Sequence, residues 1–142
     1  NILGLETLGI RMQVFCQNAL TLAKALEELA GITVNYPGLE SSPYKPLVDK
    51  QFGGLGGAIL TIRAGSREKA FKLINSLKYA HIATNIGDLR TLVIHPSSTI
   101  YLHSTKEEQE HAGVYEDTIR ISVGIEDVED LIADFTQAIE NI

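Results

Sequence analysis

The abrupt change of hydrophobic period at Gly124 constrains the fold of this chain more than any other feature of its sequence. From Thr118 to Val123, apolar and polar residues alternate, which is the pattern of a half-buried strand. Beyond the glycine, apolar residues recur at steps of three and four, which predicts an amphipathic helix; they are Val128, Leu131, Ile132, Phe135, Ile139 and Ile142. The chain must therefore combine strands with helices.

A second long amphipathic pattern opens the chain. Its narrow apolar seam is formed by Leu8, Met12, Phe15, Ala19, Leu22, Leu26 and Leu29, and Gly31 is its expected end. We interpret residues 1–30 as an opening helix that leads from an N-terminal domain outside this sequence, because so long a helix with little before it indicates packing against other residues. The first residue, Asn1, and the lone methionine, Met12, also predict a piece of a longer protein.

The remaining residues, 31–142, alternate between short strands and helices. Strands are predicted at 32–36, 58–63, 79–82, 91–95 and 118–123, with a short helix near 47–51. Ser66 is suited to cap a helix, and Thr105 with Glu108 forms a capping box that starts another. Several links are too short for a parallel crossover. We therefore expect an α+β domain, a mostly antiparallel sheet of four or five strands with helices covering one face.

The composition excludes some classes of partner. The chain of 142 residues has a net charge of −6, and its basic residues are scattered singly. Such a chain is unsuited to binding nucleic acid or an anionic membrane surface. No apolar run approaches the ~18 residues of a membrane helix. The single cysteine, Cys16, excludes an internal disulfide and suits a reducing cytoplasm.

Most candidate sites have an ordinary structural explanation. The cluster Gly53, Gly54, Gly56 and Gly57 precedes a strand and lacks the following lysine of a phosphate loop, so we interpret it as a flexible bulge. The histidines lack the spacing of a helical zinc pair, and we expect no metal site; they are His81, His95, His103 and His111. Cys16 has no evident activating base and is interpreted as a packed thiol.

The acidic start of the last helix also has a local explanation. Carboxylates favour the positive end of a helix dipole, which accounts for Glu126, Asp127, Glu129 and Asp130.

Two features leave a functional interpretation open. Arg120 lies in the middle of the strand, on its polar face and near these carboxylates. It forms either a structural ion pair or an anion clamp, because a guanidinium binds a carboxylate in a bidentate manner. The second feature is the turn from Asn85 to Asp88, which exposes amides or is simply a turn.

Several segments together resemble one enzyme family. These are GLETLGIRMQVFCQNAL, VNYPGL, NIGDLRTLVIHPSST and AGVYEDTIRISVGIEDVEDLI, in this order over essentially all 142 residues. The chain resembles the C-terminal domain of the Cys/Met-metabolism family of pyridoxal-phosphate enzymes. That family includes cystathionine gamma-synthase, cystathionine gamma-lyase, methionine gamma-lyase and O-acetylhomoserine sulfhydrylase.

The resemblance implies a fold-type-I architecture, with residues 31–142 as a C-terminal α+β substrate-binding domain. NIGDLRTLVIHP is most similar to the sulfhydrylase branch, which replaces the acetate of O-acetylhomoserine by sulfide or methanethiol and gives homocysteine or methionine. Arg120 matches the arginine that holds the substrate α-carboxylate, and Asn85 matches a position that helps there. Ile100 stands where the family often has a threonine, so that auxiliary contact is lost or supplied otherwise.

The resemblance also implies a cofactor, pyridoxal phosphate, whose Schiff-base lysine lies in the larger N-terminal domain. We expect no catalytic residue in this chain and no activity from it alone, in a cytoplasmic enzyme that forms a homo-oligomer, a tetramer. Three alternatives stay open: a cystathionine gamma-synthase or gamma-lyase type of domain, a free-standing regulatory module that binds an amino acid, and a structural partner that acts through its long helix. The length of the native gene separates the enzyme domains from the other two.

Overall fold

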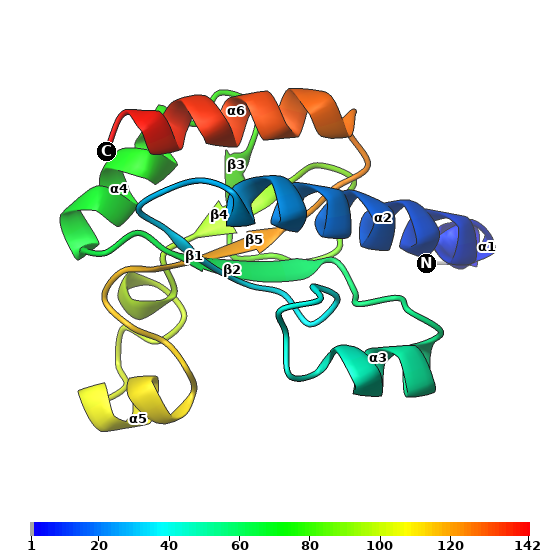
Figure 1. The fold of residues 1–142 in the computed structure, drawn as a ribbon, viewed down its shortest axis with the longest axis horizontal. Helices are drawn as coiled ribbons and strands as arrows, with labels where there is room; N and C mark the ends of the chain where they lie inside the picture. Colours follow the sequence, from blue (N-terminus) through cyan, green and yellow to red (C-terminus); the bar gives the residue numbers. More distant parts are fainter. Residues whose placement is uncertain (1) are drawn as a thin grey trace.

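The computed structural model describes residues 2–142 and contains a single sheet with helices around it (Figure 1). The helices are α1 (Ile2–Glu6), α2 (Leu8–Glu27), α3 (Lys45–Phe52), α4 (Arg67–Ser76), α5 (Lys106–His111) and α6 (Val128–Glu140), with a 3-10 turn at Pro96–Ser98. The strands are β1 (Thr33–Asn35), β2 (Ile59–Arg63), β3 (His81–Ile82), β4 (Leu92–Ile94) and β5 (Thr118–Ser122). The predicted short helix near 47–51 is α3, and all five predicted strands are present.

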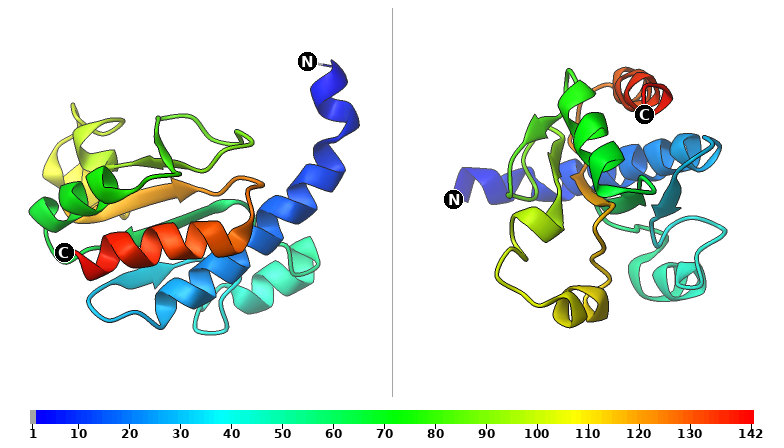
Figure 2. Two further views of the ribbon diagram at one scale, coloured as in Figure 1. Left: turned by 90° about the horizontal axis from the view of Figure 1, so that it is seen from above. Right: turned by 90° about the vertical axis from the view of Figure 1, so that its left-hand side faces the viewer.

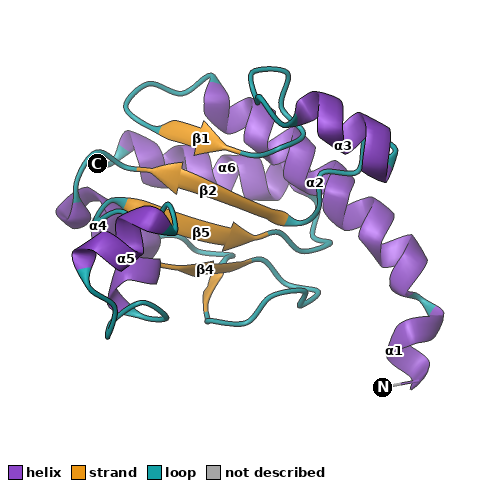
Figure 3. Cartoon of the chain, turned by 90° about the horizontal axis from the view of Figure 1, so that it is seen from below, coloured by secondary structure: helices purple, strands orange, loops and turns teal. Residues whose placement is uncertain are grey.

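The sheet has the strand order β1-β2-β5-β4-β3, so β5 is its central strand. Every neighbouring pair is antiparallel except β3 and β4, which are parallel. Helices α2, α4 and α6 lie on one face of the sheet, whereas α3 and α5 lie on the other side (Figures 1 and 3). The expected α+β class, with a mostly antiparallel sheet, is confirmed.

The core fills the space between the sheet and the three covering helices. Ile119 and Ile121 of β5 are fully buried there, packed with Leu22 of α2 and Phe135 of α6. Since successive side chains of a strand point to opposite faces, Arg120 must point away from this core. The alternation predicted for residues 118–123 therefore sets the direction of the one charged side chain in β5.

Predicted helix caps are present in the structure. The Ser66 hydroxyl accepts a hydrogen bond from the Lys69 amide at 3.2 Å, and Thr105 and Glu108 form the capping box of α5. These local contacts satisfy helix N–H groups that have no partner within the helix.

The glycine cluster forms the entry to β2, and two of its glycines lie against a buried aromatic side chain. Gly53 ends α3 in the left-handed conformation, at φ 59°. A Cβ at Gly56 would lie 2.7 Å from the hydroxyl oxygen of the buried Tyr36. That hydroxyl donates to the Gly57 carbonyl at 2.9 Å, and burial raises the pKa of the Tyr36 phenol. The cluster is therefore a packed turn that encloses an aromatic side chain.

The two halves of the opening helix have different surroundings. Leu22, Ala23 and Leu26 of α2 are in the core, whereas α1 and the start of α2 stand away from the rest of the chain (Figure 2). Exposed apolar residues of this projecting part are Ile2, Leu3, Leu5, Leu8, Ile10, Met12 and Val14. Within residues 2–142, no helix has both the length and the apolarity needed to cross a bilayer.

Candidate functional site

Arg120 lies in the central strand, opposite Thr61 of β2 and Ile94 of β4, on the face turned away from the core. Its Nη2 donates to two main-chain carbonyls, that of Thr84 at 2.8 Å and that of Asn85 at 3.1 Å. The guanidinium borders a hollow of about 550 Å³, whose other lining residues are Thr84, Asn85, Ile86, Gly87 and Asp88. The fold thus brings together the two sequence-predicted site residues, which are 35 positions apart.

The charge of Arg120 has no counterion within residues 2–142. No carboxylate of these residues lies within 4.0 Å of its guanidinium, so Arg120 forms no structural ion pair within the part of the chain that the structure describes. Its Nε is buried without a hydrogen-bond partner, and desolvation lowers the pKa of the guanidinium. A buried donor without an acceptor is rare and calls for an explanation.

Asn85 contributes its backbone rather than its side chain. The loop between β3 and β4 turns sharply here, because the Gly87 amide donates to Ser122 Oγ at 3.1 Å and the Arg90 amide donates to Asp88 Oδ1 at 3.0 Å. The Arg90 amide also lowers the pKa of the Asp88 carboxyl. The predicted turn is therefore present, and its carbonyl groups orient the arginine. The part played by Thr84 was missed, since a main-chain acceptor leaves no signal in residue type.

Glu126 differs from its predicted role as part of the helix start. Asp127 is the residue that caps α6, accepting from the Glu129 amide at 2.9 Å. The Glu126 carboxylate instead accepts hydrogen bonds from both the amide and the hydroxyl of Thr91, at the end of the loop that holds Arg120. The helix dipole accounted for Glu126 in the sequence alone, and this contact with Thr91 was missed.

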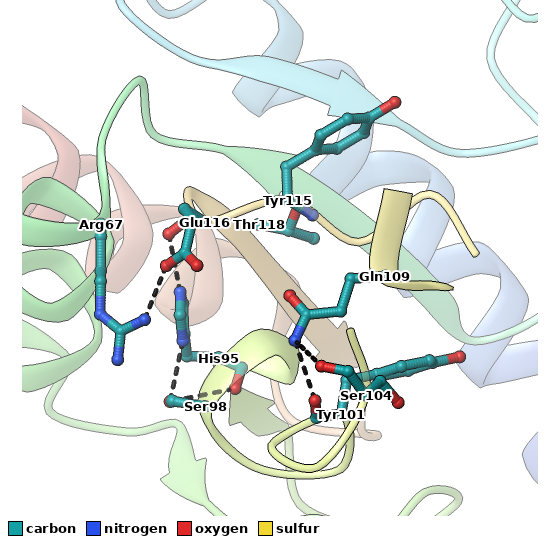
Figure 4. Close-up of polar contacts among 9 residues, drawn as sticks. All are labelled: Arg67, His95, Ser98, Tyr101, Ser104, Gln109, Tyr115, Glu116 and Thr118. Carbon is teal, nitrogen blue, oxygen red and sulfur yellow. Dashed lines mark hydrogen bonds and ion pairs between the residues drawn. The ribbon is translucent and has the colours of Figure 1, made fainter. Parts of the chain in front are cut away.

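A second polar cluster surrounds the buried His95 (Figure 4). His95 Nε2 donates to the Glu116 carbonyl at 2.8 Å, which leaves Nδ1 to accept from the Ser98 hydroxyl at 2.8 Å. Arg67 pairs with the Glu116 carboxylate at 2.6 Å, and Gln109 donates to the Tyr101 carbonyl at 2.9 Å. Both ring nitrogens have partners inside the chain, so this cluster fastens loops and is not a candidate for ligand binding.

Two further expectations concern metal ligands and Ile100. Among residues 2–142, no group of three or more His, Cys, Asp and Glu side chains is placed to hold a metal ion. Ile100 lies in the turn after Pro96–Ser98, is half exposed, and is not among the residues that line the Arg120 hollow. Ile100 therefore takes no part in lining the Arg120 hollow.

The lysines of the chain do not form a site for pyridoxal phosphate, which enzymes hold through a Schiff base to a lysine. The exposed lysines are Lys24, Lys50, Lys69, Lys72, Lys78 and Lys106. Lys45 is half buried, but hydrogen bonding to Asp49 raises its pKa, which is the opposite of what activates a lysine nucleophile. No lysine lines the Arg120 hollow. The hollow therefore offers no amino group for a Schiff base.

Comparison with known proteins places these observations in a family. Residues 1–140 match the family model described as Cys/Met metabolism PLP-dependent enzyme. The chain is 48% identical over 139 residues to a homocysteine synthase of Schizosaccharomyces pombe, covering 96% of this chain and 32% of that protein. It is 43% identical to O-acetyl-L-homoserine sulfhydrylase 1 of Thermus thermophilus, over 97% of this chain and 33% of that protein. It is 41% identical to an L-methionine gamma-lyase of Fusobacterium nucleatum, over 99% of this chain and 36% of that protein.

Solved structures agree with this assignment. A putative O-acetylhomoserine (thiol)-lyase of Campylobacter jejuni, which carries N'-pyridoxyl-lysine-5'-monophosphate, superposes with a TM-score of 0.93 at 39% identity, over 96% of this chain and 33% of that one. An O-acetylhomoserine sulfhydrylase of Wolinella succinogenes gives a TM-score of 0.82 at 35% identity, over 96% of this chain and 36% of that one. The chain thus spans about a third of the length of these relatives. It belongs to the Cys/Met-metabolism family of pyridoxal-phosphate-dependent enzymes.

Proposed function

We propose that this chain is the substrate-carboxylate-binding part of a pyridoxal-phosphate-dependent O-acetylhomoserine sulfhydrylase. The complete enzyme replaces the acetate of O-acetylhomoserine by sulfide or methanethiol and yields homocysteine or methionine. The opening part, residues 1–30, contains α1 and α2 and leads from the cofactor-bearing part, and residues 31–142 are the C-terminal substrate-binding domain. The relatives from Schizosaccharomyces pombe and Thermus thermophilus support this choice by their activities.

One observation carries the proposal: Arg120 is a partly desolvated cation without a counterion among the described residues. Its guanidinium is oriented by the Thr84 and Asn85 carbonyls and lies at the edge of a hollow. A carboxylate is the partner that best matches a planar guanidinium, because paired N–H donors meet paired oxygens. The α-carboxylate of an amino-acid substrate therefore fits here, and this chain binds and orients it.

A second candidate is gamma-elimination from methionine, since an L-methionine gamma-lyase is 41% identical to the chain. Both reactions use an α-amino acid, so Arg120 has the same role in each. The two candidates differ in the fate of the side chain and not in the way the carboxylate is held.

The proposal is tested with the full-length enzyme loaded with its cofactor. Homocysteine formation from O-acetyl-L-homoserine and sulfide is measured beside methanethiol release from L-methionine. We expect the first reaction to be the faster at equal substrate concentrations. Methanethiol release without homocysteine formation would show that the enzyme is a methionine gamma-lyase and not a sulfhydrylase. If the Arg120→Ala variant keeps the KM of the parent enzyme for the amino acid, Arg120 does not bind the carboxylate in either reaction.

A further inference from the structure

The carbonyl groups that orient Arg120 belong to an exposed loop, and something must hold this loop in place. Thr84, Asn85 and Gly87 are exposed, and the preceding strand β3 is only two residues long. A loop with few buried contacts moves readily unless hydrogen bonds fix it. The position of the guanidinium therefore depends on how the loop 83–91 is fastened to the sheet.

The far end of the loop is fastened by Glu126. Its carboxylate accepts from the amide of Thr91 and, at 3.0 Å, from the hydroxyl of Thr91, a residue that is fully buried. The same hydroxyl accepts from the Gly124 amide at 3.0 Å. Hydrogen bonds to an ionised group are stronger than neutral ones. This carboxylate thus joins the loop to the turn that follows β5.

A side chain of α2 holds the turn that carries Glu126. Asn18 Nδ2 donates to the carbonyls of Gly124 and Glu126, at 3.1 and 2.8 Å. The Ile125 amide donates to the Leu89 carbonyl at 2.9 Å, and a side chain at Gly124 would collide with that carbonyl. The loop and the turn therefore also contact each other through their backbones.

We propose that Glu126 is a positioning residue for the substrate-carboxylate site, an inference that rests on the proposed role of Arg120. Arg120 and the turn 124–126 belong to the same chain segment, while the Thr84 and Asn85 carbonyls and Thr91 belong to the same loop. The hydrogen bond from Thr91 to Glu126 joins these two segments at one end. The hydrogen bond from Gly87 to Ser122 joins them at a second point, nearer to Arg120. Loss of the Glu126 carboxylate lets the carbonyls shift, and the guanidinium loses its fixed direction.

The test uses the full-length holoenzyme with the variants Glu126→Ala, Arg120→Ala and the double variant. Since displacement of a positioning contact by ~1 Å costs up to about a hundredfold, we expect Glu126→Ala to raise KM for the amino-acid substrate about tenfold, with kcat changed less. The double variant should resemble Arg120→Ala alone, because Glu126 acts through the arginine. Asp130→Ala is the matched control; it removes an exposed carboxylate from the first turn of α6 and should leave KM unchanged.

A second measurement separates positioning from general destabilisation. Amide hydrogen exchange of the peptide 83–92 should accelerate in Glu126→Ala, whereas exchange in β2 and α4 should not. Glu126→Gln, which keeps the shape and one acceptor oxygen, should give a smaller rise of KM. It replaces Glu126→Ala in the test if the alanine variant fails to fold.

The outcomes for the two proposals are distinct. If Arg120→Ala raises KM but neither Glu126 variant does, the positioning role is wrong and the carboxylate site stands. If the effects of Arg120→Ala and Glu126→Ala multiply in the double variant, Glu126 acts on something other than Arg120. If Arg120→Ala itself leaves KM unchanged, the proposed function is wrong.

Discussion

Replacing Arg120 by alanine is the sharpest test of the site, because we expect a large loss of kcat/KM and only a small change in the free energy of unfolding. If Arg120 holds the substrate carboxylate as proposed, the variant removes one member of a poorly hydrated charge pair. Such a loss costs roughly 2–5 kcal/mol. Since each ~1.4 kcal/mol is a factor of ten, kcat/KM should fall about 30- to 5,000-fold.

The free energy of unfolding should change far less. Arg120 contributes two hydrogen bonds to main-chain carbonyls and carries a buried Nε that has no partner, so its removal also relieves an unsatisfied donor. A change of about 1 kcal/mol or less is expected for a side chain that serves a ligand rather than the core. Arg120→Lys should not restore activity, because an ammonium group cannot reproduce the planar fork.

Steady-state kinetics with varied amino-acid substrate and urea unfolding of the same preparations provide both quantities. Arg90→Ala is the matched control, since Arg90 carries the same charge on the loop that holds Arg120, and its side chain is mostly exposed. We expect its kcat/KM to stay within about twofold of the parent, as for other exposed positions. An Arg120→Ala variant that unfolds readily but retains near-normal kcat/KM would refute the carboxylate role.

Three further predictions follow from contacts described above. The 142-residue chain mixed with pyridoxal phosphate should show no saturable absorbance band assignable to one lysine, since none is both buried and activated; a stoichiometric band mapped to a single lysine would contradict this. Gly124→Ala should lower the free energy of unfolding by about 1–3 kcal/mol, because the new Cβ would meet the Leu89 carbonyl and lie 2.6 Å from the Arg90 carbonyl carbon; Gly9→Ala in α2, where nothing lies within 4 Å, is the control and should be neutral or stabilising in urea unfolding. Arg67 lowers the pKa of the Glu116 carboxyl through a hydrogen bond, so this pair stabilises the fold above the ordinary Glu116 pKa of about 4.5, and the contribution is lost as pH falls through the lower folded pKa. Because both side chains are about half exposed, Arg67→Ala should cost under ~1 kcal/mol at pH 7 and progressively less as pH falls below about 4.5; a cost that does not fall with pH would contradict the assignment.

The elements that the sequence predicts well are those determined by neighbouring residues. The alternation of residues 118–123 and the three- and four-residue steps after Gly124 identify β5 and α6, and Thr105 with Glu108 marks the start of α5. Each depends on contacts within a few positions, where residue type and spacing carry the information.

The parts that sequence reasoning misses depend on contacts between distant segments. Thr84 acts through a main-chain carbonyl, which every residue has, on a guanidinium 36 positions away. Glu126 looks like part of an acidic helix start until the fold brings Thr91 to its carboxylate. Gly124 marks the change from strand to helix pattern in the sequence, but its lack of a Cβ also admits the backbone of Leu89 and Arg90.

The use of main-chain carbonyls to orient Arg120 has a consequence for how this family diversifies. Substitutions at Thr84 and Asn85 keep the two acceptors, provided that the backbone path is preserved, because each residue presents the same carbonyl group. If Arg120 binds the substrate carboxylate as proposed, the side chains around the hollow can change with the substrate while the carboxylate contact stays the same. Selection for a new leaving group or nucleophile can thus change side chains of this loop without loss of the carbonyl groups that orient Arg120.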